Sequence, residues 1–430
     1  MCNNNSASTF SLELTHSTRI IGFGHVAFRI INCIGGVIAD KVVFLYESSQ
    51  EIDKPSVSET NGLTEIKLFI ESDSLDSDKE MKANRIVEEI NRYDLIASVV
   101  KGAEHVVFVI ALPSTGGYIL SRVTKEMSDN PFFLNTLTTA FLQFPFVFEG
   151  KVINRQAVNI WQLIESKVFE TKKYRLEGLR ETLSIGLERG NLELAKKIKN
   201  YIQGYEAVPF IGIDRHRIGV DGEGVTTLVC FHGCPLHCKW CINNKCHESP
   251  GDFPHYTPKQ LYEIVVIDDL YYRSTNGGIC FGGGEPLMQL NFISHFLVLC
   301  DKRWKITAET SLYVPSTAVY QATKVIDEFI VDIKESNSKI YKDYTGGESQ
   351  LAWNNLSLLL SLVGSERIQV RVPKIPNYNK RKDIKHTIER LRELGITRID
   401  LFEYKVNSTK NNHDMEKNAP RLLGEPRSFE

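Results

Sequence analysis

Short apolar runs alternate with longer amphipathic stretches throughout the C-terminal half of the chain. Buried strands are predicted by the length and apolar content of the runs 226–231, 277–283, 304–310, 328–334, 367–373 and 398–404. The intervening stretches 258–272 and 383–395 carry apolar residues at helical spacing. This alternation predicts parallel β/α units and therefore an α/β fold. Ligands of such folds bind at the carboxyl ends of the strands.

The N-terminal half contains a second α/β pattern. Residues 15–34 have the order strand, glycine turn and helix, residues 102–127 repeat that order, and residues 141–151 end an apolar run in FEGK. A glycine turn between strand and helix suggests nucleotide binding, although a single G-x-G is a weak signal.

Residues 156–206 differ from both halves. They are rich in Leu, Glu and Lys, and 186–202 has the spacing of an amphipathic helix. We therefore expect three segments, namely an α/β domain over 1–155, a helical connector over 156–206 and a second α/β domain over 207–430.

Composition indicates a two-domain protein of a reducing compartment. A chain of 430 residues exceeds what one core usually organises, and a net charge of −2 argues against a nucleic-acid partner. The N-terminus MCNNNSAST lacks a basic region followed by an apolar run, and VVFVIAL is too short to span a bilayer. Nine cysteines fit a reducing environment. We expect a cytoplasmic protein with no membrane partner.

Three cysteines directly after the first predicted strand of the C-terminal half are the most informative local feature. Cys234, Cys238 and Cys241 have the spacing C-x3-C-x2-C. A four-iron cluster is normally held by four thiolates, so three thiolates leave one iron open to a small molecule. An open metal position favours a catalytic site over a structural one.

The non-catalytic alternatives for these cysteines are a structural zinc site, a disulfide pair or three buried thiols. Zinc requires a fourth ligand, which His237, Cys246 or His247 could supply. Cys246 is otherwise isolated, because no further cysteine follows before Cys280, so a second cluster is not expected.

A glycine motif after the next predicted strand favours the iron–sulfur interpretation. Gly283, Gly284 and Glu285 precede a proline and match a GGEP motif. With the cysteine spacing and Trp240 before the third cysteine, this motif resembles the radical S-adenosylmethionine (SAM) superfamily.

That resemblance implies a single [4Fe-4S] cluster whose free iron chelates the methionine end of SAM. Reductive cleavage of SAM then yields methionine and a 5′-deoxyadenosyl radical, which abstracts hydrogen from a substrate. The glycine motif and Glu285 would receive the methionine ammonium group. A low-potential electron donor of flavodoxin or ferredoxin type is also implied.

The C-terminal half further resembles the glycyl-radical-enzyme activases of the pyruvate formate-lyase activating type. The segments VDGEG, AETSL, FIVDIK and IQVRVPKIPNYN occur in the order that these activases show, and Asn243 follows the last cysteine as it does there. The chain departs from the pattern at Glu223, where proline is usual. The resemblance implies a partial (β/α)6 radical SAM barrel over 207–430 and a protein or peptide substrate.

Roles for residues at the predicted strand ends follow from the same resemblance. Glu309, Thr310 and Asp332 fall where the activases hold a monovalent cation beside the SAM carboxylate. The family has aspartate at the position of Glu309, which is one methylene longer. Lys334 and Arg371 fall where the activases contact SAM, and cations suit a bound carboxylate. The bland alternative for each is a solvated charge at a strand end.

The N-terminal half resembles the nucleotide-binding domain of the FtsZ/tubulin family, which implies a doubly wound α/β domain. The family's glycine-rich phosphate loop is represented only by Ser114, Thr115, Gly116 and Gly117. Side chains in place of glycines would crowd the approach of backbone amides to phosphate. We expect a degenerate docking or scaffold domain, with retained nucleotide binding as the alternative.

These patterns together predict a radical SAM enzyme that abstracts hydrogen from a substrate, with a glycine of a partner glycyl-radical enzyme as the proposed donor. One alternative is a radical SAM enzyme that modifies a peptide or small molecule. The other is a nucleotide-binding scaffold or sensor with a structural iron–sulfur cluster.

Overall fold

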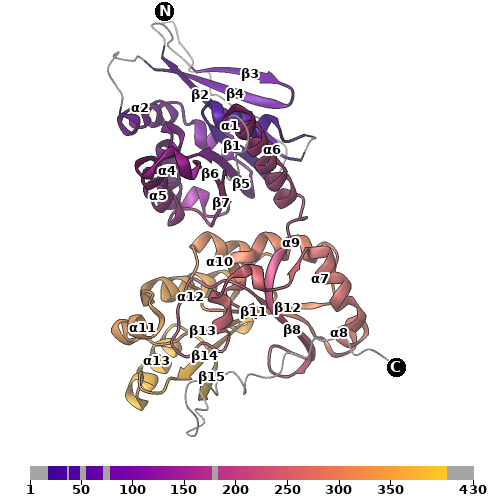
Figure 1. Ribbon diagram of the computed structural model, residues 1–430. Coiled ribbons are helices and arrows are strands. Elements are labelled where there is room, and N and C mark those ends of the chain that lie inside the picture. Colours follow the sequence, from indigo (N-terminus) through magenta and orange to yellow (C-terminus); the bar gives the residue numbers. More distant parts are fainter. Residues whose placement is uncertain (1–17, 36–37, 49–54, 71–77, 177–182, 404–430) are drawn as a thin grey trace, which may run out of the picture. The chain divides into compact units, whose positions relative to one another are not determined.

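The computed structural model describes residues 18–35, 38–48, 55–70, 78–176 and 183–403. It divides the chain into two compact units, Met1–Gln203 and Gly204–Glu430, each with its own sheet (Figure 1). Within the described ranges, no helix combines the length and the apolar character needed to cross a bilayer.

A seven-stranded sheet forms the centre of the first unit, in the order β3-β4-β2-β1-β5-β6-β7. Its strands are β1 Thr18–Phe23, β2 Asp40–Ser48, β3 Ser56–Thr60, β4 Leu63–Ile70, β5 His105–Ala111, β6 Leu137–Phe144 and β7 Glu170–Arg175. Neighbouring strands run parallel, except that β3 and β4 form an antiparallel hairpin. The hairpin turns at Asn61 and Gly62, both at positive φ, as a two-residue turn requires.

Helices cover both faces of this sheet. They are α1 His25–Asn32, α2 Lys79–Arg92, α3 Leu95–Val100, α4 Thr115–Asp129, α5 Lys151–Glu165, α6 Leu183–Ile202 and the 3-10 helices η1 Pro131–Phe133 and η2 Val147–Glu149. Successive residues of β5 enter two separate apolar cores. Val106 and Phe108 pack with α2 to α5, whereas Val107 and Val109 pack with α1 and α6. The predicted doubly wound α/β architecture is therefore confirmed.

Residues 156–206, expected as a helical connector, supply elements to this first unit. Strand β7 pairs with β6 along its whole length. Helix α6 buries Leu194, Ile198 and Tyr201 in the core that it shares with α1. The Tyr201 hydroxyl lies 2.8 Å from Thr139 Oγ1 on β6. The sequence pattern identified the helix but not the polar edge strand before it, because its residues Glu170–Arg175 are mostly charged.

An eight-stranded sheet forms the centre of the second unit, in the order β10-β8-β9-β11-β12-β13-β14-β15. Its strands are β8 Val208–Ile218, β9 Val225–Phe231, β10 His255–Tyr256, β11 Gly278–Gly283, β12 Lys305–Thr310, β13 Glu328–Asp332, β14 Ile368–Lys374 and β15 Arg398–Glu403. The six strands from β9 to β15 in this order are parallel. Strand β8 pairs antiparallel with β9, and β10 pairs antiparallel with β8. Six parallel strands with intervening helices, in a sheet that does not close among the described residues, confirm the prediction of a partial (β/α)6 barrel.

Helices connect the parallel strands of the second unit. They are α7 Pro258–Val265, α8 Asp269–Thr275, α9 Leu290–Leu297, α10 Ser316–Ala322, α11 Ser338–Thr345, α12 Ser349–Val363, α13 Arg381–Glu393 and the 3-10 helices η3 Asn244–His247, η4 Pro250–Asp252, η5 Val266–Asp268, η6 Pro286–Gln289 and η7 Ser365–Arg367. The amphipathic stretch 258–272 is broken into α7, η5 and α8. The break coincides with Asp268, which is buried and accepts hydrogen bonds from Arg215 at 2.6 and 2.7 Å.

Candidate functional site

The three predicted cluster cysteines lie on the loop that leaves the carboxyl end of β9. Cys234, Cys238 and Cys241 are half-buried. The loop is fixed by its backbone. The amide of His237 donates to the Thr345 carbonyl at 2.8 Å, and the amide of Lys239 donates to the Tyr344 carbonyl at 3.0 Å.

Zinc gains no support from the surroundings of these thiols. Among the residues that the structure describes, no group of three or more His, Cys, Asp or Glu side chains is placed to hold a metal ion. His237 and His247, two candidate zinc ligands, instead stack on each other with ring centroids 4.2 Å apart. A cubane cluster requires a different arrangement of thiolates, because each thiolate binds a different iron and the sulfurs surround the cluster instead of meeting at one ion.

The electrostatics of the loop separate its thiols. Burial raises the pKa of Cys238 to about 11, although the Lys334 ammonium group opposes that rise. A hydrogen bond from the Cys246 thiol lowers the pKa of Cys241. The pKa of Cys246 itself is raised by its contacts with Cys234 and Cys241.

Three buried polar atoms around the loop have no hydrogen-bond partner among the described residues. They are Asp332 Oδ1, the indole nitrogen of Trp240 and the Tyr341 hydroxyl. Both Asp332 and Tyr341 lie close to Cys238. The Asp332 carboxylate raises the pKa of Cys238, and Cys238 raises the pKa of Tyr341. Leaving a buried polar group unsatisfied costs about 1–3 kcal/mol. Atoms of this kind fit a site that receives a polar ligand beside the cysteines.

The glycine motif is in direct backbone contact with the cysteine loop. The Gly284 amide donates to the Phe231 carbonyl at 2.8 Å, and the Glu285 amide donates to the Gly233 carbonyl at 2.9 Å. The Asn243 side-chain amide donates to the Gly283 carbonyl at 3.1 Å. A Cβ atom at Gly284 would lie 1.9 Å from the Gly233 oxygen. Gly284 is therefore required for the close approach of the glycine motif to the cysteine loop, in addition to any contact that it makes with a ligand.

Replacing Gly284 by alanine is expected to push the cysteine loop away from β11. The clash is with backbone, which cannot rotate away as a flexible side chain can, and overpacking of this kind costs about 1–3 kcal/mol. We expect lower iron content after reconstitution and a lower urea midpoint. Gly251→Ala is the matched control, because its Cβ would lie no closer than 3.9 Å to another atom. Equal iron content in the two variants would contradict this role.

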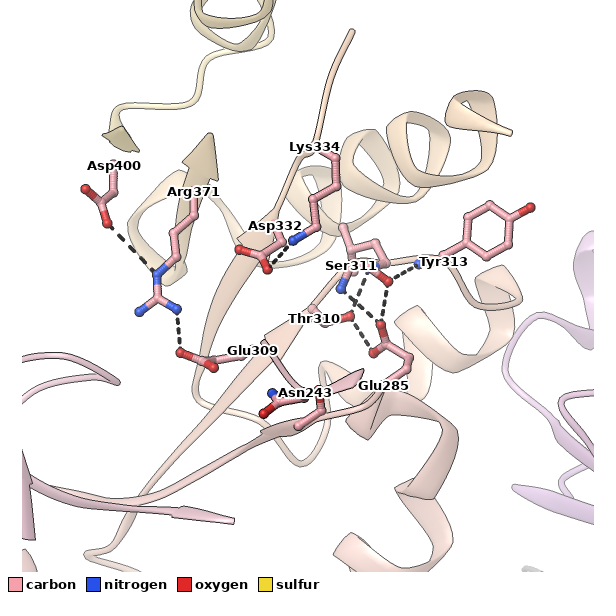
Figure 2. Close-up of polar contacts among 12 residues, drawn as sticks. Asn243, Glu285, Glu309, Thr310, Ser311, Tyr313, Asp332, Lys334, Arg371 and Asp400 are labelled. Atoms are coloured by element: carbon pink, nitrogen blue, oxygen red, sulfur yellow. Dashed lines mark hydrogen bonds and ion pairs between the residues drawn. The ribbon is translucent and has the colours of Figure 1, made fainter. Parts of the chain in front are cut away.

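Glu285 is placed differently from the expectation that it receives the methionine ammonium group. Its carboxylate is 1% exposed and accepts hydrogen bonds from Thr310 Oγ1 at 2.6 Å and from the Ser311 amide and hydroxyl at 3.0 and 2.7 Å (Figure 2). The Leu287 amide donates a fourth bond at 3.2 Å. Burial raises the pKa of Glu285, and these donors oppose the rise. The carboxylate thus joins the glycine motif to the end of β12.

The three predicted cation ligands do not converge on one point. Thr310 donates to Glu285, Glu309 pairs with the Arg371 guanidinium group, and Asp332 Oδ2 lies 2.7 Å from Lys334 Nζ (Figure 2). Each of these three side chains binds a different protein group, so their arrangement gives no support for a site that holds a monovalent cation. Burial raises the pKa of Glu309, while Arg371 opposes that rise.

Arg371 is occupied by protein groups on more than one side. Besides Glu309, it donates to the Val220 carbonyl at 2.7 Å, and its Nε lies 4.0 Å from Asp400 Oδ2. Strand register places Arg371 between Asp332 on β13 and Asp400 on β15. The Lys334 ammonium group lowers the pKa of Cys238 and therefore acts on the cysteines. The Arg371 side chain instead connects neighbouring strands.

In the first unit, the glycine-poor loop Ser114–Gly117 at the start of α4 is already in contact with a protein side chain. Tyr46 contacts the Thr115 side chain and the Gly116 amide through its hydroxyl, whose pKa is raised by burial. The Gly117 amide donates to Ser114 Oγ at 3.2 Å. These are the amides that would meet a phosphate at a helix N-terminus. Nucleotide binding therefore gains no support from the geometry.

We expect titration calorimetry of the full chain with GTP to give no saturable heat. The reason is that Tyr46 also approaches the first glycine turn, where a Cβ at Gly24 would lie 2.9 Å from its hydroxyl. A saturating isotherm would contradict this expectation and favour the nucleotide-binding alternative.

Comparisons with known proteins identify a matching family and several relatives. Residues 220–314 match the family described as a 4Fe-4S single cluster domain. The choline trimethylamine-lyase activating enzyme of Oleidesulfovibrio alaskensis is 27% identical, with 43% of this chain and 79% of that protein covered. The pyruvate formate-lyase 2-activating enzyme of Escherichia coli is also 27% identical, with 47% and 77% covered. These homologues confirm the predicted resemblance to the glycyl-radical-enzyme activating enzymes, and the matched family is one of 4Fe-4S cluster domains.

Solved structures are also similar to parts of the chain. An FtsZ dimer from M. jannaschii is 16% identical, with 47% of this chain and 64% of that chain covered and a TM-score of 0.34. A domain of a pyruvate-formate lyase-activating enzyme from Bacteroides vulgatus is 22% identical, with 34% and 92% covered and a TM-score of 0.28. Scores of this size carry no argument, so the FtsZ likeness of the first unit stays a prediction.

Proposed function

We propose that this chain, whose relatives are glycyl-radical-enzyme activating enzymes, is itself a radical SAM activase. Cys234, Cys238 and Cys241 would hold one [4Fe-4S] cluster, and the hydrogen donor would be a glycine of a partner glycyl-radical enzyme. The observation that carries the proposal is the placement of these three half-buried thiols at the carboxyl end of β9, in backbone contact with the glycine motif. When bound, the cluster supplies the electron that cleaves SAM to methionine and a 5′-deoxyadenosyl radical.

The protein's own groups would bind and orient the methionine end of SAM. Asp332 Oδ1, buried and without a partner among the described residues, can accept hydrogen bonds from an ammonium group. Lys334, paired with the other oxygen of Asp332, places a positive charge beside the cysteines for a carboxylate. Gly283 and Gly284 keep the neighbouring backbone free of side chains. Glu285 acts through Thr310 and Ser311, by fixing the end of β12.

Anaerobic reconstitution with iron and sulfide, followed by reduction in the presence of SAM, tests the proposal. The assay is formation of 5′-deoxyadenosine, first without and then with a candidate glycyl-radical enzyme. Product together with a glycyl radical signal in the partner is the expected result, with a flavodoxin or ferredoxin as the electron donor. Product without any protein radical would favour a peptide or small-molecule substrate. A fully loaded, reduced cluster that yields no product would favour a scaffold or sensor.

A further inference from the structure

Two carboxylates at the carboxyl ends of β12 and β13 are each paired with a cationic side chain of the protein (Figure 2). Glu309 binds the Arg371 guanidinium group, and Asp332 Oδ2 lies 2.7 Å from Lys334 Nζ. Strand register sets Asp332 beside Arg371 on β14, so the four charged groups are neighbours at this end of the sheet. Two negative and two positive charges balance each other. A further cation would add a positive charge that both protein cations repel.

The length of the Glu309 side chain suits this pairing. Glu309 and Arg371 lie on β12 and β14, which are separated in the sheet by β13, so their ion pair spans one strand. The activase pattern has aspartate at this position, which is one methylene shorter. On the other neighbouring strand, a Cβ atom at Gly282 would lie 3.1 Å from Glu309 Oε2. Gly282 therefore leaves room for the carboxylate of the longer side chain.

The Arg371 guanidinium group is held by protein groups besides Glu309. It donates to the Val220 carbonyl at 2.7 Å, and its Nε lies 4.0 Å from Asp400 Oδ2. The side chains of Arg371 and Glu309 are only 17% and 21% exposed, so solvent ions screen their attraction weakly. Arginine stays protonated in proteins. The pair therefore contains a permanent positive charge that does not exchange with the solvent.

The third predicted cation ligand, Thr310, is also engaged by the protein. Its hydroxyl donates to Glu285 at 2.6 Å and accepts from the Leu312 amide at 2.9 Å. A hydroxyl group has one hydrogen and two lone pairs, so a single lone pair of Thr310 is left. Hard cations bind where several oxygen ligands converge. The three predicted ligands therefore do not fit a monovalent cation.

We propose that Arg371 takes the place of an exchangeable monovalent cation in this chain, so that binding of SAM requires no such ion. The activase resemblance implies the ion, whereas the residues present supply a guanidinium group of their own. The inference rests on the proposed function, because the site concerned is the one proposed to bind SAM. A fixed guanidinium group balances the charge of Glu309 without the dependence on ion concentration that a bound cation brings.

The test compares salts of different cations. The reconstituted full chain is unfolded by heat under anaerobic conditions in Na⁺, K⁺ or tetramethylammonium chloride at equal ionic strength, which keeps general screening the same. SAM binding to the wild type is measured by equilibrium dialysis in the same salts. Arg371→Met removes the guanidinium group, and Arg371→Lys keeps a positive charge. Arg398→Met is the matched control, because its carboxylate partner Glu328 retains Lys305.

We expect the wild type to unfold at the same temperature in all three salts and to bind SAM with a Kd that changes by less than about twofold. Na⁺ or K⁺ should raise the unfolding temperature of Arg371→Met by about 2–4 °C relative to tetramethylammonium. The reason is that Glu309 and Asp332 then share an unbalanced negative charge. Arg371→Lys and Arg398→Met should respond to the salts as the wild type does.

A higher unfolding temperature or tighter SAM binding of the wild type in Na⁺ or K⁺ would overturn the inference. A folded Arg371→Met protein without a salt response would overturn it as well, because no charge would then be needed at this position. The wild-type comparison decides the question even if Arg371→Met does not fold. Failure of the wild type to form 5′-deoxyadenosine in any salt would instead overturn the proposed function. The unfolding comparison needs neither SAM nor turnover, so the two failures are distinguishable.

Discussion

Replacing Cys238 by alanine is expected to remove the visible absorbance of the reconstituted cluster and, with it, all cleavage of SAM. The reason is chemical, because two remaining thiolates rarely retain a cubane cluster. The loop itself should survive the change. Its contacts with Thr345 and Tyr344 are made by the backbone amides of His237 and Lys239, which flank the substituted residue. Absorbance, iron content and 5′-deoxyadenosine formation are the measurements.

Cys33→Ala is the matched control for this substitution. Cys33 is an exposed free cysteine of the first unit, so its removal changes the thiol count without touching the cysteine loop. If the Cys238 variant kept both its absorbance and its activity, the assignment of Cys238 as a ligand would be wrong.

Replacing Glu285 by alanine is expected to destabilise the second unit by on the order of 4 kcal/mol. The substitution removes one acceptor group that serves four donors, and buried partners left unpaired cost about 1–3 kcal/mol each, with incomplete additivity. Urea unfolding followed by tryptophan fluorescence is a suitable measurement. Of the four tryptophans, Trp161 lies in the first unit, and the other three report on the second.

Glu285→Gln separates the structural effect from a direct role in SAM binding. Glutamine keeps the size of the side chain but replaces one acceptor oxygen with an NH2 donor, which then faces the donors of Ser311 or Thr310. We expect an intermediate loss of stability. If Glu285→Ala unfolded at the same urea concentration as the wild type but bound SAM more weakly, Glu285 would instead be the group that receives the methionine ammonium group.

The sequence was sufficient to predict the α/β repeat because its signal is periodic and local. All six parallel strands of the second unit coincide with apolar runs, and their carboxyl ends carry the predicted cysteines, glycines and charged residues. Strand β7 was not predicted. Its charged residues give no apolar run, and its place in the sheet depends on pairing with β6, which lies distant in sequence.

The roles of individual side chains were harder to predict than their positions. Glu285, Glu309 and Asp332 all lie where the sequence placed them, at or near strand ends. Their partners, however, come from neighbouring strands or loops: Thr310 and Ser311 for Glu285, and Arg371 for Glu309. A linear pattern shows that a carboxylate is present at a strand end. It does not show whether protein donors have already used the lone pairs of that carboxylate.

The attachment of β7 and α6 to the first sheet has a practical consequence for anyone who truncates this gene. A fragment that starts at residue 156 would keep these two elements but lose the sheet on which they pack. Leu194, Ile198 and Tyr201 would then face water, and β7 would present an unpaired edge, a combination that favours aggregation. A fragment that starts at Gly204 avoids both hazards, so expression trials of the second unit should begin there.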